Sequence, residues 1–316
     1  MKIAYLMHSA REYDELIETI NQLIRQGDHV FIMINDNDLR GKIHFVYAED
    51  RRVHISETQE FAQEGDMSLA RGTIIQMKEA LEYDEYDYFI NLTDGMMPIK
   101  PRSEIIAFLT EHEGKDFYHI ARTEKEDPQL RKKALKYYTF TNLLSFPTGA
   151  LVRWFTKANA SFLNALGLRR KLNDVIMIGS PWFMLSRESA KKIVAEFNYV
   201  SASFKLSWYP EEMYIPMMME KFAPDAAKAH INEDYRVVGP DGAWVESQCA
   251  RDLTREVLAA HPEALFGGRI LAQGDTLSLY NDYFDKYNEG YVRSKESIEK
   301  EERMIDPDIF NTNRKK

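Results

Sequence analysis

The sequence predicts an α/β fold in which a mostly parallel sheet is flanked by helices. Two apolar runs of strand length, Ile3–Met7 and Val30–Ile34, lie near the start of the chain, and the second is continuous, as in strands buried on both faces. Between them, apolar side chains recur at helical spacing from Leu16 to Ile24, and Gly27 ends the pattern. A strand, a helix and a second strand in close succession form a βαβ unit, which indicates a parallel sheet.

Further elements follow the same scheme. We expect short strands at Ile43–Tyr47 and Val53–Ile55, a helix at Ser68–Leu81 and another strand at Tyr86–Leu92. These segments alternate as they do in α/β domains.

The domain organisation is predicted from composition along the chain. Residues 1–290 are expected to form one domain that ends in a helical tail, and residues 291–316 a charged C-terminal segment. A helical, basic insert is expected at about residues 118–172. Its cationic and aromatic side chains could bind a phosphorylated or lipid-linked acceptor, contact an anionic membrane surface, or form a solvated helix face. The cationic residues are Arg131, Lys132, Lys133, Lys136, Arg169, Arg170 and Lys171, and the aromatic residues between them are Tyr137, Tyr138, Phe140 and Trp154.

Composition excludes several functional classes. The 316 residues are 44% hydrophobic and 29% charged, and no run approaches the roughly 20 apolar residues of a membrane span. A net charge of −9 argues against nucleic acid as the partner. Cys249 is the only cysteine, which excludes an intrachain disulfide and fits a reducing cytoplasm. The opening residues are expected to form a first strand, not a secretory leader.

The most informative stretch spans residues 179–216. After a turn at residues 179–181, Trp182–Leu185 is an apolar run that we expect to be a buried strand ending at Ser186, the N-cap of an amphipathic helix. Pro210 suits the first position of the next helix, with Glu211 and Glu212 directly behind it. The helix dipole favours ionised carboxylates there, whether they serve chemistry or only cap the helix.

In this order, the two blocks resemble the core-2/I-branching N-acetylglucosaminyltransferases and the related peptide O-xylosyltransferases. The resemblance spans about residues 1–290 and implies a GT-A-like, Rossmann-related fold in a bacterial, cytosolic relative. The family's Gly-Ser-x-Trp and Pro-Asp-Glu blocks stand here as Gly179, Ser180 and Trp182, and as Pro210, Glu211 and Glu212.

The resemblance also implies an inverting, metal-independent transfer of a sugar from a UDP-sugar donor to a hydroxyl of a glycan, lipid-linked saccharide or glycoprotein. Glu212 matches the catalytic base, which takes the proton of the acceptor hydroxyl. Arg236 and Arg269 match the cations that stabilise the departing diphosphate, although the family has Lys at the second position. N-acetylglucosamine is the first expectation for the sugar, ahead of xylose, galactose and glucose. Expected acceptor contacts are Trp182, Glu211 and Ser180.

Two acidic residues are candidates for donor binding. The family's Asp after the strand that ends at Leu92 falls on Met96, so either Asp94 takes over that contact or the contact is missing; Asp94 and Gly95 also fit a plain turn. Asp36 lies directly after the second strand, where open α/β sheets bind ligands.

Two other functions remain open. Asp36 and Asp38 have the Asp-x-Asp spacing of metal-dependent nucleotide-sugar transferases, although Asn and Asp clusters are also common in turns. The second alternative is a nonenzymatic saccharide-binding protein with the same fold. The main interpretation requires no cofactor and no metal, and places the protein in the cytoplasm with the basic insert available for peripheral contact with the inner face of the membrane.

Overall fold

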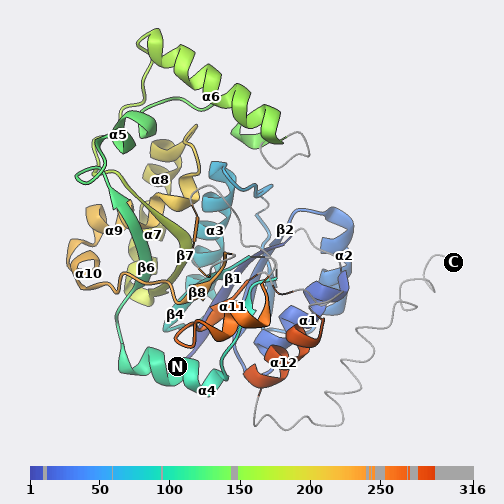
Figure 1. The fold of residues 1–316 in the computed structure, drawn as a ribbon. Helices are drawn as coiled ribbons and strands as arrows, with labels where there is room; N and C mark the ends of the chain where they lie inside the picture. Colours follow the sequence, from blue (N-terminus) through green and yellow to red (C-terminus); the bar gives the residue numbers. More distant parts are fainter. Residues whose placement is uncertain are drawn as a thin grey trace, which may run out of the picture.

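The computed structural model describes residues 1–9, 13–58, 60–93, 95–143, 149–239, 242, 244–245, 253–268, 270 and 277–288. Its centre is a six-stranded sheet with the order β3-β2-β1-β4-β7-β6 (Figure 1). Neighbouring strands from β3 to β4 pair in parallel, whereas β7 pairs antiparallel with β4 and β6. The predicted fold class is confirmed. The strands are β1 (Ile3–Ser9), β2 (His29–Ile34), β3 (Val53–Ile55), β4 (Tyr88–Leu92), β6 (Phe117–Thr123) and β7 (Met177–Ser186).

Helices cover both faces of this sheet, and each layer has its own apolar core. One layer contains α1 (Tyr13–Ile24), α2 (Asn37–Val46), α4 (Arg102–Glu111) and α12 (Leu277–Tyr287). The other contains α3 (Met67–Tyr83), α7 (Arg187–Ala195), α8 (Phe197–Phe204), α9 (Tyr214–Phe222) and α10 (Pro224–Ala229). A three-stranded sheet packs with α11 (Arg255–Ala259) and comprises β5 (Met97–Pro98), β9 (Phe266–Gly267) and β8 (Arg236–Val237).

Two local predictions are wrong. The run Ile43–Tyr47 is not a strand, because residues 43–46 belong to helix α2, which buries Ile43 and Leu39 one turn apart. A run of five residues is too short for periodicity to separate a strand from a helix. Residues 179–181 do not form the predicted turn, because they lie inside the ten-residue strand β7.

The predicted insert divides into a strand and helices. Its first residues join the main sheet as β6, and the helical part consists of α5 (Pro128–Ala134), the 3₁₀ helix η1 (Thr141–Leu143) and α6 (Gly149–Ala165). Figure 1 shows α6 at the top of the view, set off from the two helical layers. Among the described residues, no helix combines the length and apolar character needed to cross a bilayer. The predicted tail at 291–316 lies outside the described residues.

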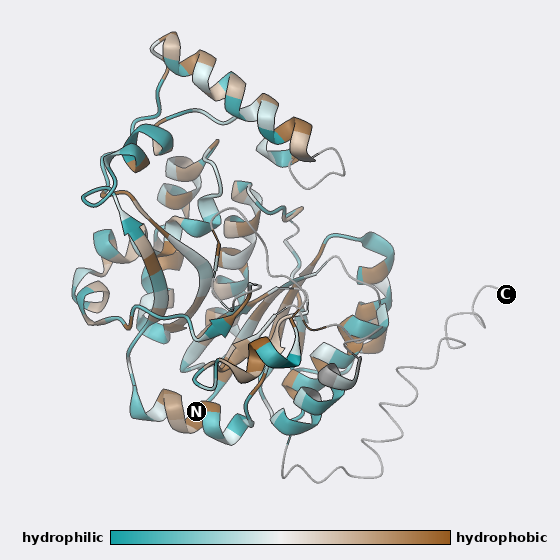
Figure 2. Ribbon diagram, viewed as in Figure 1, coloured by the Kyte–Doolittle hydropathy of each residue, from teal (hydrophilic) through white to brown (hydrophobic). Residues whose placement is uncertain are grey.

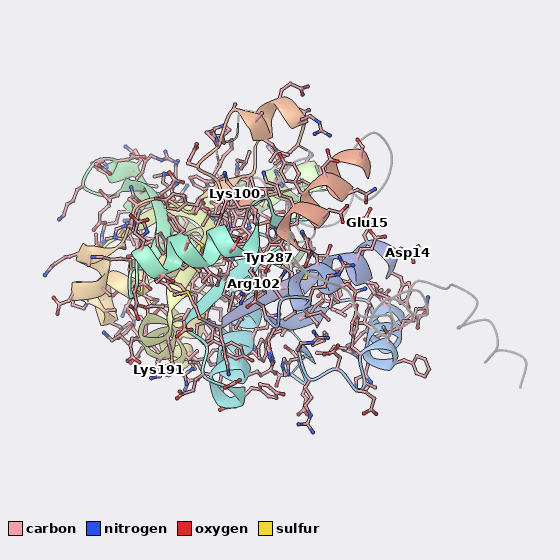
Figure 3. The ribbon with its side chains drawn as sticks, turned by 90° about the horizontal axis from the view of Figure 1, so that it is seen from below. Asp14, Glu15, Lys100, Arg102, Lys191 and Tyr287 are labelled. Carbon is pink, nitrogen blue, oxygen red and sulfur yellow. The ribbon has the colours of Figure 1, made fainter. Side chains whose placement is uncertain are left out.

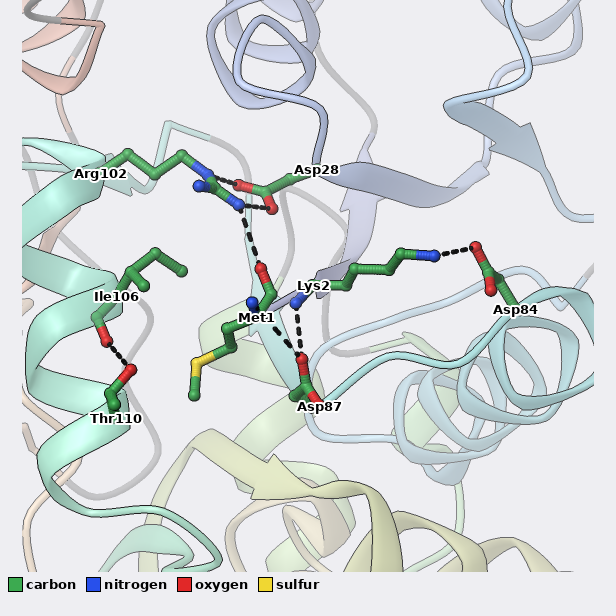
Figure 4. Close-up of polar contacts among 8 residues, drawn as sticks. All are labelled: Met1, Lys2, Asp28, Asp84, Asp87, Arg102, Ile106 and Thr110. Atoms are coloured by element: carbon green, nitrogen blue, oxygen red, sulfur yellow. Dashed lines mark hydrogen bonds and ion pairs between the residues drawn. The ribbon is translucent and has the colours of Figure 1, made fainter.

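The amino-terminal end of the sheet is held by paired charges (Figure 4). The guanidinium of Arg102 makes two hydrogen bonds of 2.6 Å to the two carboxylate oxygens of Asp28. The hydroxyl of Tyr287 donates to the same carboxylate at 3.0 Å, and Figure 3 shows Tyr287 beside Arg102. The ammonium of Lys2 lies 2.8 Å from the carboxylate of Asp84. The contacts of Arg102 and Tyr287 tie α4 and α12 to the sheet at the end opposite to the carboxyl ends of β1, β2 and β4.

Candidate active site

The order of the strands places a ligand-binding edge next to β1. From β1 the chain runs to β2 and β3 on one side of the sheet, and then returns to β4 on the other side of β1. In open α/β sheets such a reversal leaves a crevice at the carboxyl ends of the strands, where ligands bind. The predicted blocks around Trp182, Glu212 and Arg236 belong to β7, the following 3₁₀ turn and β8.

A break in the pairing of β6 with β7 shapes the Gly-Ser-x-Trp block. The register moves from Tyr118 opposite Phe183 to Ile120 opposite Gly179, so residues 180–182 bulge out of the ladder. A Cβ atom on Gly179 would lie 1.7 Å from the carbonyl oxygen of His119, which only glycine avoids. Bulges of this kind reorient side chains beside active sites.

Asn91 at the end of β4 satisfies the backbone of this bulge. Its amide nitrogen donates to the carbonyl of Pro181 at 3.0 Å, and its amide oxygen accepts from the N–H of Phe183 at 2.7 Å. The Ser180 hydroxyl accepts from the N–H of Trp182 at 3.2 Å. The indole of Trp182 is buried in the core, and its Nε1 has no hydrogen-bond partner among the described residues.

Arg236 joins the bulge to the second sheet. It is 5% exposed, and its guanidinium donates to the carbonyls of Asn91, Phe183 and Asp234 at 2.7–3.0 Å. The guanidinium also lies 5.0 Å from the centre of the Phe266 ring. Burial lowers the pKa of Arg236 to about 10, and the neighbouring Asp234 opposes that shift. Most of its donors therefore serve to hold β4, β7 and β8 together, and Nε has no partner among the described residues.

Asp234 completes this network from the loop before β8. It is buried, its carboxylate accepts from the N–H of Arg236 at 3.1 Å, and it is hydrogen-bonded to the side chain of Ser180. Burial raises the pKa of Asp234, while Arg236 and Ser180 lower it. Ser180, Trp182 and Arg236, three of the predicted residues, are thus brought together by contacts that their sequence positions do not reveal.

The Pro-acidic-Glu block forms the 3₁₀ helix η2 (Pro210–Glu212), and α9 begins only at Tyr214. Pro210 and the two carboxylates lie in the first turn of a helix as predicted, but this helix is a 3₁₀ turn that precedes the α-helix. Tyr209 before them adopts a left-handed conformation, with φ of 46°, which costs energy for a residue that carries a Cβ atom. Turn η2 packs between α3 and β7, and Glu212 is 2% exposed.

Burial changes the protonation of Glu211. The residue is 4% exposed, and its Oε1 accepts from the N–H of Gly65 at 2.5 Å, while Oε2 has no partner among the described residues. Burial is the largest cause that raises the pKa of Glu211 to about 8; the negative charges of Glu64 and Asp66 add to it. The prediction that Glu211 stays ionised is therefore wrong near neutral pH, because loss of hydration outweighs favourable backbone dipoles.

A second polar group, half-buried and with a buried ring nitrogen, lies near η2 at the end of β1. His8 Nε2 is 3.0 Å from the hydroxyl of Thr73 on α3, and that hydroxyl is also bonded to Tyr214. Burial lowers the pKa of His8 to about 4, so the ring is neutral at physiological pH. Its Nδ1 has no hydrogen-bond partner among the described residues.

Asp36 has a structural contact. Its carboxylate accepts from the N–H of Leu39 at 2.7 Å and caps α2. Asp36 and Asp38 are exposed, and within the described part of the chain no group of three His, Cys, Asp or Glu side chains is arranged to hold a metal ion. The neighbouring Asn35 instead exchanges two hydrogen bonds with the backbone of Ala62, which holds the loop before α3.

A basic cavity of about 370 Å³, here called the lysine pocket, lies beside η2. Lys157 lies 5.0 Å from the centre of the Trp208 ring, and Lys136 donates to Ser161 at 3.2 Å. Arg170 is buried, and its guanidinium donates to the carbonyls of Ala134 and Ser203. The lining contains no carboxylate among the described residues. Its charged and aromatic members are Lys133, Lys136, Lys157, Arg170, Tyr138 and Trp208.

With this geometry in place, comparison with known proteins is decisive for the family. A model of the Core-2/I-branching enzymes matches residues 3–260. The chain belongs to the Core-2/I-branching enzyme family. The resemblance predicted from the Gly-Ser-x-Trp and Pro-acidic-Glu blocks is thereby confirmed, and the family consists of glycosyltransferases.

Other comparisons add little to this assignment. No curated protein matches the chain. Among solved structures, the crystal structure of A197 from STIV aligns with 61% of this chain and 68% of its own chain, at 10% identity and a TM-score of 0.26. A likeness of that size carries no argument about function.

For a Core-2/I-branching enzyme, the residues predicted from sequence divide into three groups. Glu211 and Glu212 lie in η2, and Ser180, Trp182 and Arg236 lie in the bulge network, while Asp36 caps α2 at a separate strand end. Asp94 and Arg269 lie outside the described residues. The roles assigned to these residues in donor and acceptor binding stay predictions.

Sequence reasoning missed His8, Thr73 and Asp234. His8 could have been recognised from the sequence, because it is a histidine that follows an otherwise apolar strand. Thr73 and Asp234 carried no such signal, because their importance comes from contacts with residues distant in sequence.

Proposed function

We propose that this family member is an inverting, metal-independent glycosyltransferase that uses a UDP-sugar, with Glu212 as its catalytic base. The observation that carries the proposal is the position of the Pro210–Glu212 block, buried between the start of α3 and the bulged strand β7. A carboxylate in such a place is shielded from water, which strengthens its interaction with a bound hydroxyl.

The chemistry follows from a single displacement. Glu212 takes the proton of the acceptor hydroxyl, the acceptor oxygen bonds to the anomeric carbon, and the bond from that carbon to the diphosphate oxygen breaks. Attack from the face opposite to the departing UDP inverts the configuration. Arg269 and Arg236 are proposed to stabilise the charge on the diphosphate. For Arg236, three of the five N–H groups hold backbone carbonyls, which leaves Nε–H and one N–H of Nη1 for this purpose among the described contacts.

N-acetylglucosamine is the first proposal for the transferred sugar, with xylose, galactose and glucose next. Donor contacts from Asp94 and Asp36, and acceptor contacts from Trp182, Glu211 and Ser180, are part of the same proposal. Protonated Glu211 is a hydrogen-bond donor near neutral pH, which suits an acceptor hydroxyl.

The lysine pocket supports an anionic acceptor. It joins η2 through Trp208 and Met213, and its cations face no carboxylate among the described lining residues. Cationic side chains bind phosphate or carboxylate oxygens, while aromatic rings pack against sugar faces. A saccharide that carries a phosphate, as in a lipid-linked precursor, matches both features.

One experiment tests the base. Release of UDP from UDP-N-acetylglucosamine and related donors is measured for the wild type, Glu212→Gln and the matched neighbour Glu211→Gln, each with and without EDTA. We expect Glu212→Gln to lower kcat by about 10²–10⁴-fold with donor binding retained, and EDTA to have no effect. Loss of activity in Glu211→Gln with full activity in Glu212→Gln would reassign the base.

The same assay separates the two alternatives. A metal-dependent transferase would lose activity in EDTA and in Asp36→Ala, whereas the proposal expects EDTA to have no effect and Asp36→Ala only to weaken donor binding. A nonenzymatic saccharide-binding protein would bind ligands without releasing UDP. Because Arg236 also holds backbone carbonyls, its variants are compared by the increase in melting temperature that UDP produces, not by melting temperature alone. A cytoplasmic site of action is proposed from the cysteine content and composition.

A further inference from the structure

Helix α6 turns its apolar side chains outward. At 100° per residue, Leu151, Trp154, Phe155 and Phe162 fall on one stripe about 100° wide. Their exposed fractions are 68%, 66%, 50% and 63%. The opposite face is the buried one, and it carries Thr156 and Ala160. An amphipathic helix of a globular protein normally has its apolar stripe against the core, so this one is inverted.

Apolar residues beside the helix extend the stripe into a patch. Leu166 and Leu168 follow α6 and are 61% and 51% exposed, and Phe140 and Leu143 before it are 41% and 38% exposed. Figure 2 shows hydrophobic colouring along α6, on the outermost element of the view. Patches of this kind mark interaction sites, because a soluble protein rarely exposes so many large apolar side chains together.

The charge around the patch is strongly positive. The segment 128–172 contains nine basic residues and no acidic residue, in a chain whose net charge is −9. Lys157 lies on α6 itself and is exposed. Arg169 and Lys171 follow the helix and are also exposed. The partner of this face therefore combines an apolar interior with negative charge at its surface.

We propose that the outer face of α6, with Phe140, Leu143, Leu166 and Leu168, docks onto an anionic lipid bilayer. The helix lies in the plane of the interface, its apolar stripe enters the boundary of the acyl chains, and the exposed cations of the segment meet lipid phosphates. A second copy of the chain is a less suitable partner, because a symmetric contact through this face would bring two positively charged segments together, and these repel each other.

The docking deepens the proposed function. Lys157 and Ser161 of α6 line the lysine pocket, so the helix that touches the bilayer also borders the site proposed for an anionic acceptor. An acceptor whose phosphate is anchored in the membrane would reach that pocket without leaving the lipid. This part rests on the proposed transferase activity, whereas the docking itself does not.

The test uses the full chain and sedimentation with vesicles of phosphatidylcholine, alone or mixed with phosphatidylglycerol. The wild type is expected to bind the anionic vesicles, to release them at high salt, and to bind neutral vesicles weakly. The double variant Leu151→Ser/Phe162→Ser should lose binding by about tenfold or more. Phe45→Ser is the matched control, because Phe45 is an aromatic residue on α2 that is 59% exposed.

Two further measurements keep the outcomes distinct. UDP release with a water-soluble acceptor should be unchanged in the double variant, so a failure of docking and a failure of the transferase proposal are separate results. Light scattering after size-exclusion chromatography measures the oligomeric state and so tests whether this face instead binds a second copy of the chain. Absence of binding to anionic vesicles at low salt, equal binding by the double variant, or a dimer that only this variant loses would each overturn the proposal.

Discussion

The two ends of the central sheet differ in whether their buried charged groups have hydrogen-bond partners. At the amino end, Asp28 meets Arg102 through two hydrogen bonds and Tyr287 through a third. At the carboxyl end, Glu211 keeps one oxygen without a partner among the described residues. Paired charges hold a structure together, whereas buried groups with shifted pKa values are the usual equipment of active sites. The amino end is held by paired charges, whereas the carboxyl end contains the residues to which the proposal assigns the chemistry.

The carboxyl end also contains unusual backbone. Tyr209 and Tyr235 adopt positive φ angles directly before Pro210 and Arg236, and β7 bulges at residues 180–182. Such features persist only where the surrounding contacts impose them, and they cluster at functional sites.

The largest effect is expected from Gly179→Ala. The added Cβ would meet the carbonyl oxygen of His119, and two backbone strands cannot move apart as a flexible side chain can. We expect the free energy of unfolding to fall by about 3 kcal/mol or more. Gly41→Ala is the control, since a Cβ atom added there would have no atom within 4 Å and helix α2 should gain up to about 1 kcal/mol. Urea denaturation of both variants measures the two free energies of unfolding. Equal values for Gly179→Ala and Gly41→Ala would show that the bulge does not require glycine.

The amino end is tested by Asp28→Asn. Removing the charge leaves the guanidinium of Arg102, whose side chain is 21% exposed, without its ion-pair partner. We expect a loss of about 3 kcal/mol, measured by the same denaturation. Asp84→Asn breaks the more exposed pair with Lys2 and should cost less than about 1 kcal/mol. If the two variants lost the same stability, burial of the pair would not be the reason for the difference.

A third prediction concerns Glu211 and is a dependence on pH. Its pKa of about 8 in the folded protein lies above the ordinary value of 4.5, so the folded state binds more protons between these limits. Stability should therefore fall as pH rises from about 5 to 8, by up to about 1.4 kcal/mol per pH unit relative to Glu211→Gln. The difference between the two free energies of unfolding is measured across this range. A difference that is flat, or that grows in favour of the wild type, would contradict a buried protonated carboxyl group.

Much of the fold was predictable because it depends on patterns within single segments. The continuous apolar run of β2 and the periodic stripe of α1 each identify their element, and together they require a parallel sheet. The run at residues 43–46 failed because a five-residue pattern fits both a helix and a strand. The acidic block was recognised from its neighbours in sequence, but the protonation of Glu211 was not.

By itself, the sequence determined the opening strand, helix and strand, the family blocks at residues 179–182 and 210–212, and the basic character of residues 128–172. These are properties of neighbouring residues, which periodicity and composition record. Only the tertiary structure decided that Arg236 holds three backbone carbonyls, that Asp36 caps a helix, and that the apolar stripe of α6 faces outward. Each of these depends on which distant groups surround a side chain, because desolvation and hydrogen bonding are set by contacts in space.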